Sequence, residues 1–452
     1  MAAMLHKFRP FSESHFNTMS RQTIQTQLLH GPAGGIEQAI AASREDMKSL
    51  LCALIAQQSI SGHEQGLVQF AHQWAREHGF TTDVWQSTDQ LVAAYPQGQA
   101  RHISLANRPT LVLGMACCNP SQPALIFNAH SDVVDAPGPE RWKFKPWMAT
   151  VTDDRIYGRG ACDVKGPLVS ALWAMHSVSQ SLGGPTHAPV LLELVPGEED
   201  AVGLGTLTSV LRGYRADCSI VLEPTESLPR LASRPGLRFA IGISGKAVHG
   251  TVKWLGEDAI AATRKVLDAL DQMERDYNGI APDPLFSDCP IARPITVDFI
   301  QGGQWQGMVA DECRCAGYFE LLPGDSLEAW QQKFRGDLRR KLAAVGVPAN
   351  SLTVEFTETY RGHSTPPDAI ICRLAEKAVA ESPTHTRWQG WKAFNSGCEA
   401  GLRANLHNTP TLVWGPGSLA HAHAADEFVN FNEVERVASM FARTIDEWLR
   451  LR

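Results

Sequence analysis

The chain has 452 residues, of which 44% are hydrophobic and 20% are charged, and its formal net charge is −7. This ordinary globular composition excludes a globally disordered chain, and the length favours two or three domains. The mildly acidic balance offers no electrostatic basis for nucleic-acid binding, and no apolar run is long enough to predict a membrane span.

The first 35 residues are predicted to be a polar, solvated N-terminal extension. They lack the apolar core and small-residue cleavage site of a secretory signal. Lys7, Arg9 and Arg21 would suit a transit peptide, but Glu13 and the weak amphipathicity favour a simple extension. The ten cysteines contain no CxxC pair, so we expect mostly buried free thiols and a cytoplasmic protein.

The pattern of apolar residues then predicts an α/β domain. Helical spacing indicates helices over residues 36–55, 64–77 and 166–179 and a final helix over 432–451. Continuous apolar runs that alternate with helical stretches are typical of a mostly buried sheet with helices around it. The runs that predict strands are residues 111–113, 124–127, 190–195, 219–222 and 411–414.

A different pattern begins near Leu231. Predicted strands and helices follow one another in the order βαββαβ, which matches the ferredoxin-like motif. They cover residues 237–244, 257–276, 295–300, 312–321, 326–344 and 352–357. The sequence therefore predicts one discontinuous α/β domain, residues 36–230 and 361–452, and an inserted α+β domain, residues 231–360.

Acids and histidines follow the predicted strands of the first domain. Because the carboxyl ends of strands in an open α/β sheet face one crevice, we expect these side chains to converge. Each alone has an ordinary explanation as a loop histidine, a solvated turn or a helix cap. Together they form a ligand set suited to divalent zinc, and a metal pair would relieve the repulsion among buried acids. The residues are His130, Asp132, Asp163, Glu198, Glu199, Glu223, His421, His423, Asp426 and Glu427.

Five motifs carry a resemblance to a known family. The chain reads HSDVV at 130–134, GRGACDVKG at 158–166, PGEE at 196–199, LEP at 222–224, and GPG at 415–417 leading to AHAADE at 422–427. Over about residues 40–448 it resembles the M20 family of metallohydrolases. That family contains acetylornithine deacetylases, succinyl-diaminopimelate desuccinylases, aminoacylases and glutamate carboxypeptidases.

The resemblance implies a two-zinc site at the carboxyl ends of the strands, with cobalt or manganese as substitutes. Asp163 would bridge the two metals. His130 and Glu223 would complete one site, and Glu199 and His423 the other. The competing ligand is His421, and a cis peptide bond is expected at Asp163–Val164.

The same resemblance assigns roles around the metals. Glu198 would be the general base, taking a proton from water as it attacks an amide carbonyl and passing it to the leaving amine. Asp132 would accept the second ring N–H of His130 and orient it.

The inserted domain is expected to act as a lid and dimerisation domain. Its segment GKAVHG at 245–250 resembles one whose histidine reaches the active site of the partner subunit. His249 would therefore stabilise the oxyanion in trans in a homodimer. A turn histidine after a strand is the structural alternative.

Two positions depart from the family pattern. Glu320 stands where an arginine that holds a substrate carboxylate is common, although Arg293 or Arg314 would compensate. Glu399 lies in the segment 395–400, in place of a glycine-rich substrate loop. Both departures favour an amine-bearing acyl substrate.

The predicted function is a metal-dependent hydrolase that cleaves the amide bond of an N-acyl amino acid or related small amine, similar to acetylornithine deacetylase. A dipeptidase or carboxypeptidase of the same family is the alternative. A noncatalytic binding protein on this scaffold is a third hypothesis.

Overall fold

The computed structural model describes residues 34–86, 104–115, 118–119, 124–136, 138–183, 189–200, 203–280, 283–358, 360–382 and 388–452. The predicted N-terminal extension, apart from its last two residues, lies outside the described residues. The nine described cysteines are all free thiols, as expected, and six of them are buried.

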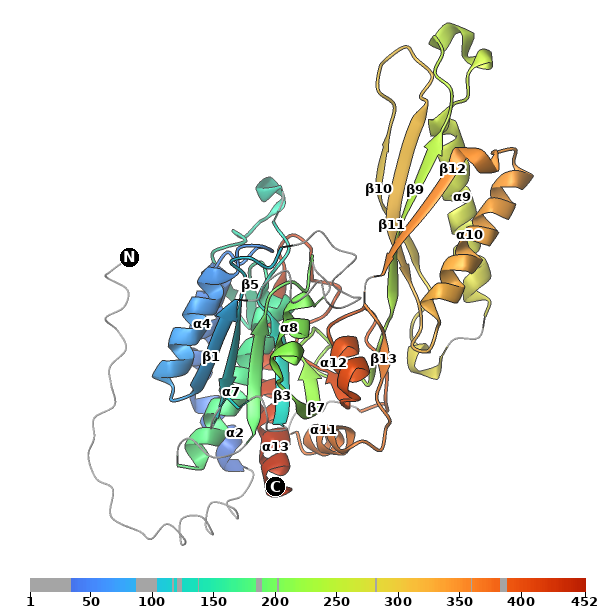
Figure 1. The fold of residues 1–452 in the computed structure, drawn as a ribbon. Coiled ribbons are helices and arrows are strands. Elements are labelled where there is room, and N and C mark those ends of the chain that lie inside the picture. The colour runs from blue at the N-terminus through green and yellow to red at the C-terminus, as the bar shows by residue number, and fades with distance from the viewer. Residues whose placement is uncertain are drawn as a thin grey trace, which may run out of the picture.

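A six-stranded sheet forms the centre of the larger unit (Figure 1). Its strand order is β1-β2-β6-β3-β7-β14. The strands from β6 to β14 run parallel to their neighbours, whereas β2 is antiparallel to both β1 and β6. The bounds are Thr81–Gln86 (β1), Pro109–Gly114 (β2), Ala124–His130 (β3), Val190–Val195 (β6), Ala216–Val221 (β7) and Thr411–Val413 (β14).

Helices cover both faces of this sheet, so β2, β3 and β6 are buried at every residue without alternation. One face packs against α3 (Arg44–Ala56), α4 (Gln65–Glu77), α7 (Gly166–Ser181), α11 (Ile370–Ala380) and α13 (Phe431–Arg450). The other face carries α8 (Leu204–Arg212) and α12 (Ala400–His407). This arrangement confirms the predicted α/β layer.

The smaller unit is a four-stranded antiparallel sheet with the strand order β10-β11-β9-β12. Its two helices cover one face and form a separate hydrophobic cluster. The order along the chain is βαββαβ, as predicted for a ferredoxin-like fold. The elements are β9 (Gly236–Ser244), α9 (Ala259–Asn278), β10 (Ile295–Gly302), β11 (Glu312–Glu320), α10 (Leu327–Ala344) and β12 (Leu352–Glu358).

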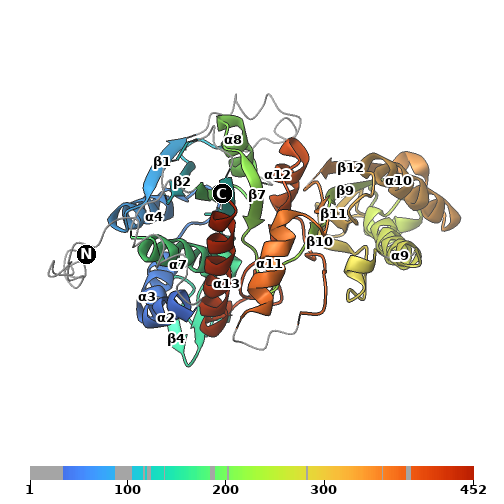
Figure 2. The ribbon, with the colours of Figure 1, turned by 90° about the horizontal axis from the view of Figure 1, so that it is seen from below.

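Two short strands join the units. β8 (Ala232–Ser233) and β13 (His363–Ser364) pair antiparallel where the chain enters and leaves the smaller unit. Figures 1 and 2 show the smaller unit beside α11 and α12. The separate cores support the predicted division of the chain, whose boundaries stay a prediction.

Several elements were not expected from the sequence. β1 has a polar sequence, TTDVWQ, and is only partly buried at the sheet edge. A three-stranded sheet is formed by β4 (Thr150–Thr152), β5 (Arg155–Tyr157) and β15 (Phe428–Asn430). One turn of π-helix, η3 (Ala161–Lys165), precedes α7 and contains the predicted cis peptide bond Asp163–Val164.

The remaining short helices are α2 (Gly34–Ala42), η2 (Pro139–Arg141), η4 (Gly250–Leu255), η5 (Pro284–Phe286) and η6 (Ala349–Ser351). Within the described ranges, every helix is too short or too polar to cross a lipid bilayer.

Candidate active site

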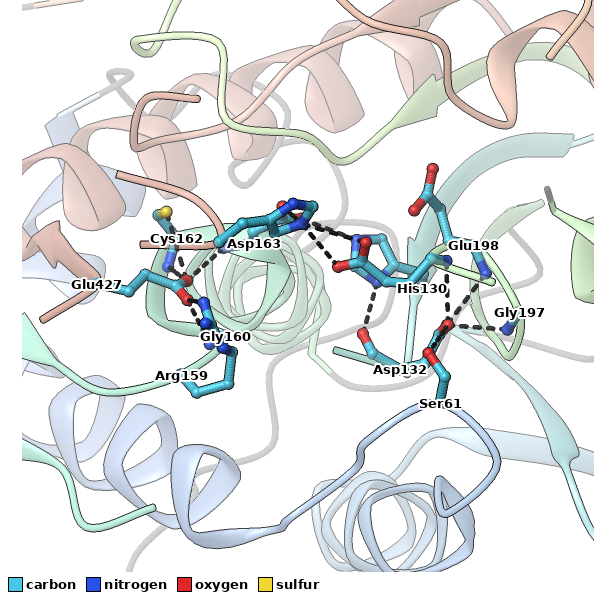
Figure 3. A network of polar contacts seen from close by, with 12 residues as sticks. Ser61, His130, Asp132, Arg159, Gly160, Cys162, Asp163, Gly197, Glu198 and Glu427 are labelled. Atoms are coloured by element: carbon cyan, nitrogen blue, oxygen red, sulfur yellow. Dashed lines mark hydrogen bonds and ion pairs between the residues drawn. The ribbon is translucent and has the colours of Figure 1, made fainter. Parts of the chain in front are cut away.

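The predicted site residues lie at the carboxyl ends of three parallel strands. His130 is the last residue of β3, Glu198 and Glu199 follow the end of β6, and Glu223 follows β7. Asp163 comes from η3 and faces His130 (Figure 3). Because parallel strands end at one edge of the sheet, residues separated by many positions in the sequence meet there.

Asp163 lies between two histidines. Its Oδ1 is 3.0 Å from His130 Nε2, and its Oδ2 is 3.3 Å from His423 Nε2. Glu199 approaches His423 Nε2 to 3.1 Å. Each oxygen of Asp163 thus faces a different histidine, as a carboxylate shared by two metal ions must. The ring of His421 instead packs on Phe428, with centroids 4.2 Å apart.

A second group of acids adjoins the first. Carboxylate oxygens of Glu198, Glu223 and Glu399 lie within 4.8 Å of one another, as do ligand atoms of His130, Asp163 and Glu199. The sequence singled out Glu399 as part of a substrate loop, not as a neighbour of Glu198 and Glu223. Neither oxygen of its buried carboxylate has a hydrogen-bond partner.

The charges at this edge are unbalanced. Burial raises the pKa of Glu198 well above its usual range, and the neighbouring carboxylates of Glu199 and Glu399 raise it further. Burial and the charge of Asp163 raise the pKa of Glu223 in the same way. Crowded buried carboxylates beside imidazole nitrogens form a donor set that a divalent cation binds and neutralises. These residues therefore fit a metal centre.

The histidines respond in the opposite direction. Hydrogen bonds to Asp163 and Glu199 raise the pKa of His423 to about 11. Burial lowers the pKa of His130, but its hydrogen bond to Asp163 outweighs burial and the net shift is upward. Asp163 itself is buried, yet hydrogen bonds from His130 and His423 bring its pKa below the ordinary value.

Asp132 is placed differently from the prediction. Nδ1 of His130 lies 2.8 Å from the main-chain oxygen of Asp132, so the ring is oriented by the carbonyl and not by the carboxylate. The carboxylate instead accepts hydrogen bonds from the main-chain N–H groups of Gly197, Glu198 and Glu199, at 2.8, 3.1 and 3.1 Å. The prediction missed this because a main-chain turn six dozen positions away in the sequence has no local pattern.

Glu427 holds the loop that carries Asp163 (Figure 3). Its carboxylate accepts from Arg159 Nη1 at 2.6 Å and from the main-chain N–H groups of Gly160, Cys162 and Asp163 at 3.0, 3.0 and 3.2 Å. The sequence identified Glu427 only by its spacing from a ligand. Its position four residues after His423 was the available signal.

His249 does not join this cluster within one chain. It is exposed on the smaller unit, where its Nδ1 lies 2.8 Å from Thr251 Oγ1. β9 leads away from the connecting strands, and a strand of nine residues spans roughly 30 Å. His249 follows the far end of β9 and so lies far from the connection to its own catalytic unit.

The two proposed substitutes for the missing arginine also differ. Arg293 is buried and paired with Asp325 at 3.0 Å, whereas Arg314 is exposed on the open face of the smaller sheet. Burial raises the pKa of Glu320 to about 7, and its Oε2 has no hydrogen-bond partner. The pairing of Arg293 leaves it poorly suited to bind a substrate carboxylate.

Comparison with known proteins identifies relatives of the whole chain. The model of peptidase family M20/M25/M40 matches residues 126–447. The chain is 25% identical over 446 residues to an N-formyl-4-amino-5-aminomethyl-2-methylpyrimidine deformylase of Halalkalibacterium halodurans, across 91% of this chain and 96% of that protein. It is 29% identical over 324 residues to an acetylornithine deacetylase of Myxococcus xanthus, across 71% of this chain and 79% of that protein.

Solved structures share the fold. The dipeptidase Dug1p of Saccharomyces cerevisiae has a TM-score of 0.72 at 14% identity, covering 93% of this chain and 99% of its own. The YXEP protein of Bacillus subtilis, described as a dinuclear metal-binding peptidase of family M20, has a TM-score of 0.58 at 15% identity, covering 91% of this chain and 99% of its own. At these identities the similarity bears on the fold alone.

Proposed function

The chain belongs to peptidase family M20/M25/M40, whose members are metal-dependent hydrolases of amide bonds, and we propose that it removes a small acyl group from an amino acid or related amine. The observation that carries the proposal is the Asp163 carboxylate between His130 and His423, with Glu198 beside the cluster.

The proposed metal centre holds two zinc ions, with cobalt or manganese as substitutes. Asp163 would bridge them, His130 and Glu223 would complete one site, and Glu199 and His423 the other. When bound, the ions would polarise the scissile carbonyl and acidify the attacking water.

Glu198 is the proposed general base. Three main-chain N–H groups bound to Asp132 hold the turn at Glu198, whose carboxylate points away from Asp132 (Figure 3). A carboxylate in this position takes a proton from water and then protonates the leaving amine.

The acids near the site support an amine-bearing substrate. Glu320 is a carboxyl group where relatives commonly carry an arginine, so it favours a neutral or cationic group over a second carboxylate. Glu399 adds a further acid beside Glu198. An acyl amine such as N-acetylornithine fits this balance better than an acyl-glutamate.

We also propose a cytoplasmic homodimer formed through the smaller unit. Its edge strand β10 exposes Phe299 and Ile300, and an unpaired edge with apolar side chains is suited to pairing with a second copy. In that dimer His249 would reach the partner's site and stabilise the oxyanion.

Chelation tests the proposed chemistry. Removal of metal should abolish hydrolysis across a panel of N-acyl amino acids that includes N-acetylornithine and acyl-glutamates, and zinc or cobalt should restore it. Protein dialysed without chelator is the control. Full activity in metal-free protein would contradict the proposal, and faster cleavage of dipeptides than of acyl amines would favour the peptidase alternative.

A further inference from the structure

The peptide group of Glu198 is held from both sides. Its N–H donates to Asp132 Oδ1 at 3.1 Å, and its C=O accepts a hydrogen bond from the Tyr360 hydroxyl at 2.8 Å. Asp132 follows strand β3 of the catalytic sheet, whereas Tyr360 belongs to the segment that joins β12 to β13. The proposed base therefore contacts the connection to the smaller unit.

Tyr360 is packed tightly in this position. The residue is 9% exposed. A Cβ atom on Gly397 would lie 2.7 Å from the ring, and a Cβ on Gly203 would lie 3.5 Å from it. The ring thus lies between the loop that follows Glu198 and the loop that precedes Glu399. Side chains larger than glycine at position 397 would displace it.

The main chain of Tyr360 connects the two crossing segments. Its carbonyl accepts a hydrogen bond from the N–H of Gly236, the first residue of β9, at 3.0 Å. Movement of either connecting segment would therefore move the Tyr360 hydroxyl relative to Glu198.

We propose that Tyr360 is a positioning residue that couples the connection between the two units to the orientation of Glu198. The hydroxyl fixes the carbonyl end of the Glu198 peptide while Asp132 fixes the N–H end, so the side chain projects in one direction. The inference rests on the proposed role of Glu198 as general base. Tyr360 acts through Glu198 and needs no contact with substrate.

The Tyr360→Phe variant tests this role. It removes one hydroxyl and keeps the ring, so metal content and KM should stay within about twofold of wild type while kcat falls about tenfold, since a misaimed base loses rate and not binding. Tyr214→Phe is the matched control, because its hydroxyl also makes a 2.8 Å hydrogen bond, to Asp83 Oδ2, away from the site. That variant should keep wild-type kcat.

A second experiment separates positioning from a general structural effect. In a Glu198→Gln background, Tyr360→Phe should cause no further loss of the residual rate, because the group it orients is gone. A further tenfold loss there, or an unchanged kcat in the single variant, would overturn the inference. Assays use the N-acyl compound that wild type hydrolyses fastest. A wild type that hydrolyses none would contradict the proposed function instead.

Discussion

At the scale of single residues, Asp163 and Glu198 are held by different partners. Asp163 is positioned through its own N–H and its loop by Glu427, and its oxygens face two histidines. Glu198 is positioned through its peptide by Asp132 and Tyr360. Their substitutions should therefore have separable effects.

Asp163→Asn should lose metal, because an amide lacks the charge that a bridging ligand supplies. Glu198→Gln should retain metal and lose turnover by roughly 10²–10⁴-fold, since only the proton acceptor is removed. Metal content and initial rates measured on the same preparations check both. Equal metal loss in the two variants would reverse the proposed roles.

At the scale of elements, the turn between β6 and α8 leaves no room for a side chain at Gly205. A Cβ there would lie 2.2 Å from the main-chain oxygen of Pro196, at the end of the strand that precedes Glu198. The N–H of Gly205 also donates to that oxygen at 3.0 Å. The helix start and the strand end are thus in direct main-chain contact.

Gly205→Ala should lower the free energy of unfolding by about 1–3 kcal/mol and reduce metal affinity, because the turn must open to admit the methyl group. Gly336→Ala is the matched control, since no atom lies within 4 Å of a Cβ at that position of α10. That change should be neutral or stabilising by up to about 1 kcal/mol. Denaturant unfolding and metal titration measure both, and equal behaviour of the two variants would contradict the packing argument.

The connecting strands contain a buried histidine that should make stability depend on pH. His363 Nε2 lies 3.0 Å from the Thr411 carbonyl and Nδ1 lies 2.8 Å from Ser233 Oγ. Burial lowers its pKa to about 4. The neutral ring is favoured in the folded protein, so its contribution is complete above the unfolded pKa of about 6.5 and is lost as pH falls towards about 4.

The expected loss is about 3 kcal/mol over that pH interval. Urea unfolding at several pH values should show a smaller pH dependence in His363→Gln than in wild type. His72→Gln, in the partly buried surface of α4, is the control. An unchanged pH dependence in His363→Gln would show that other groups cause the acid instability.

At the scale of the whole molecule, the site is complete in one chain except for His249. The smaller unit exposes its β10 edge and carries His249 beyond the far end of β9. A histidine in this place can serve a site only in another copy of the chain, or serve none. Subunit mixing distinguishes the two cases.

His249→Ala and Glu198→Gln should each be poorly active alone, and mixing the two should restore about a quarter of wild-type activity. Half of the randomly mixed dimers combine both variants, and each of those has one intact site. Initial rates after exchange of subunits, with each variant alone as control, measure this. No recovery despite confirmed exchange would exclude action in trans.

Much of the fold follows from patterns within short stretches of sequence. Apolar runs predicted the central strands, and the order βαββαβ predicted the smaller sheet. β1 and the sheet of β4, β5 and β15 were missed, because edge and three-residue strands bury too little apolar surface to leave a pattern.

By itself the sequence determined the ligand types and their placement after strands, because residue identity and strand ends are local properties. Only the tertiary structure decided that the Asp132 carboxylate binds the Glu198 turn, that Glu399 lies beside Glu223, and that Tyr360 reaches Glu198. These contacts join residues distant in sequence through main-chain groups, which are the same at every residue and so carry no sequence signal.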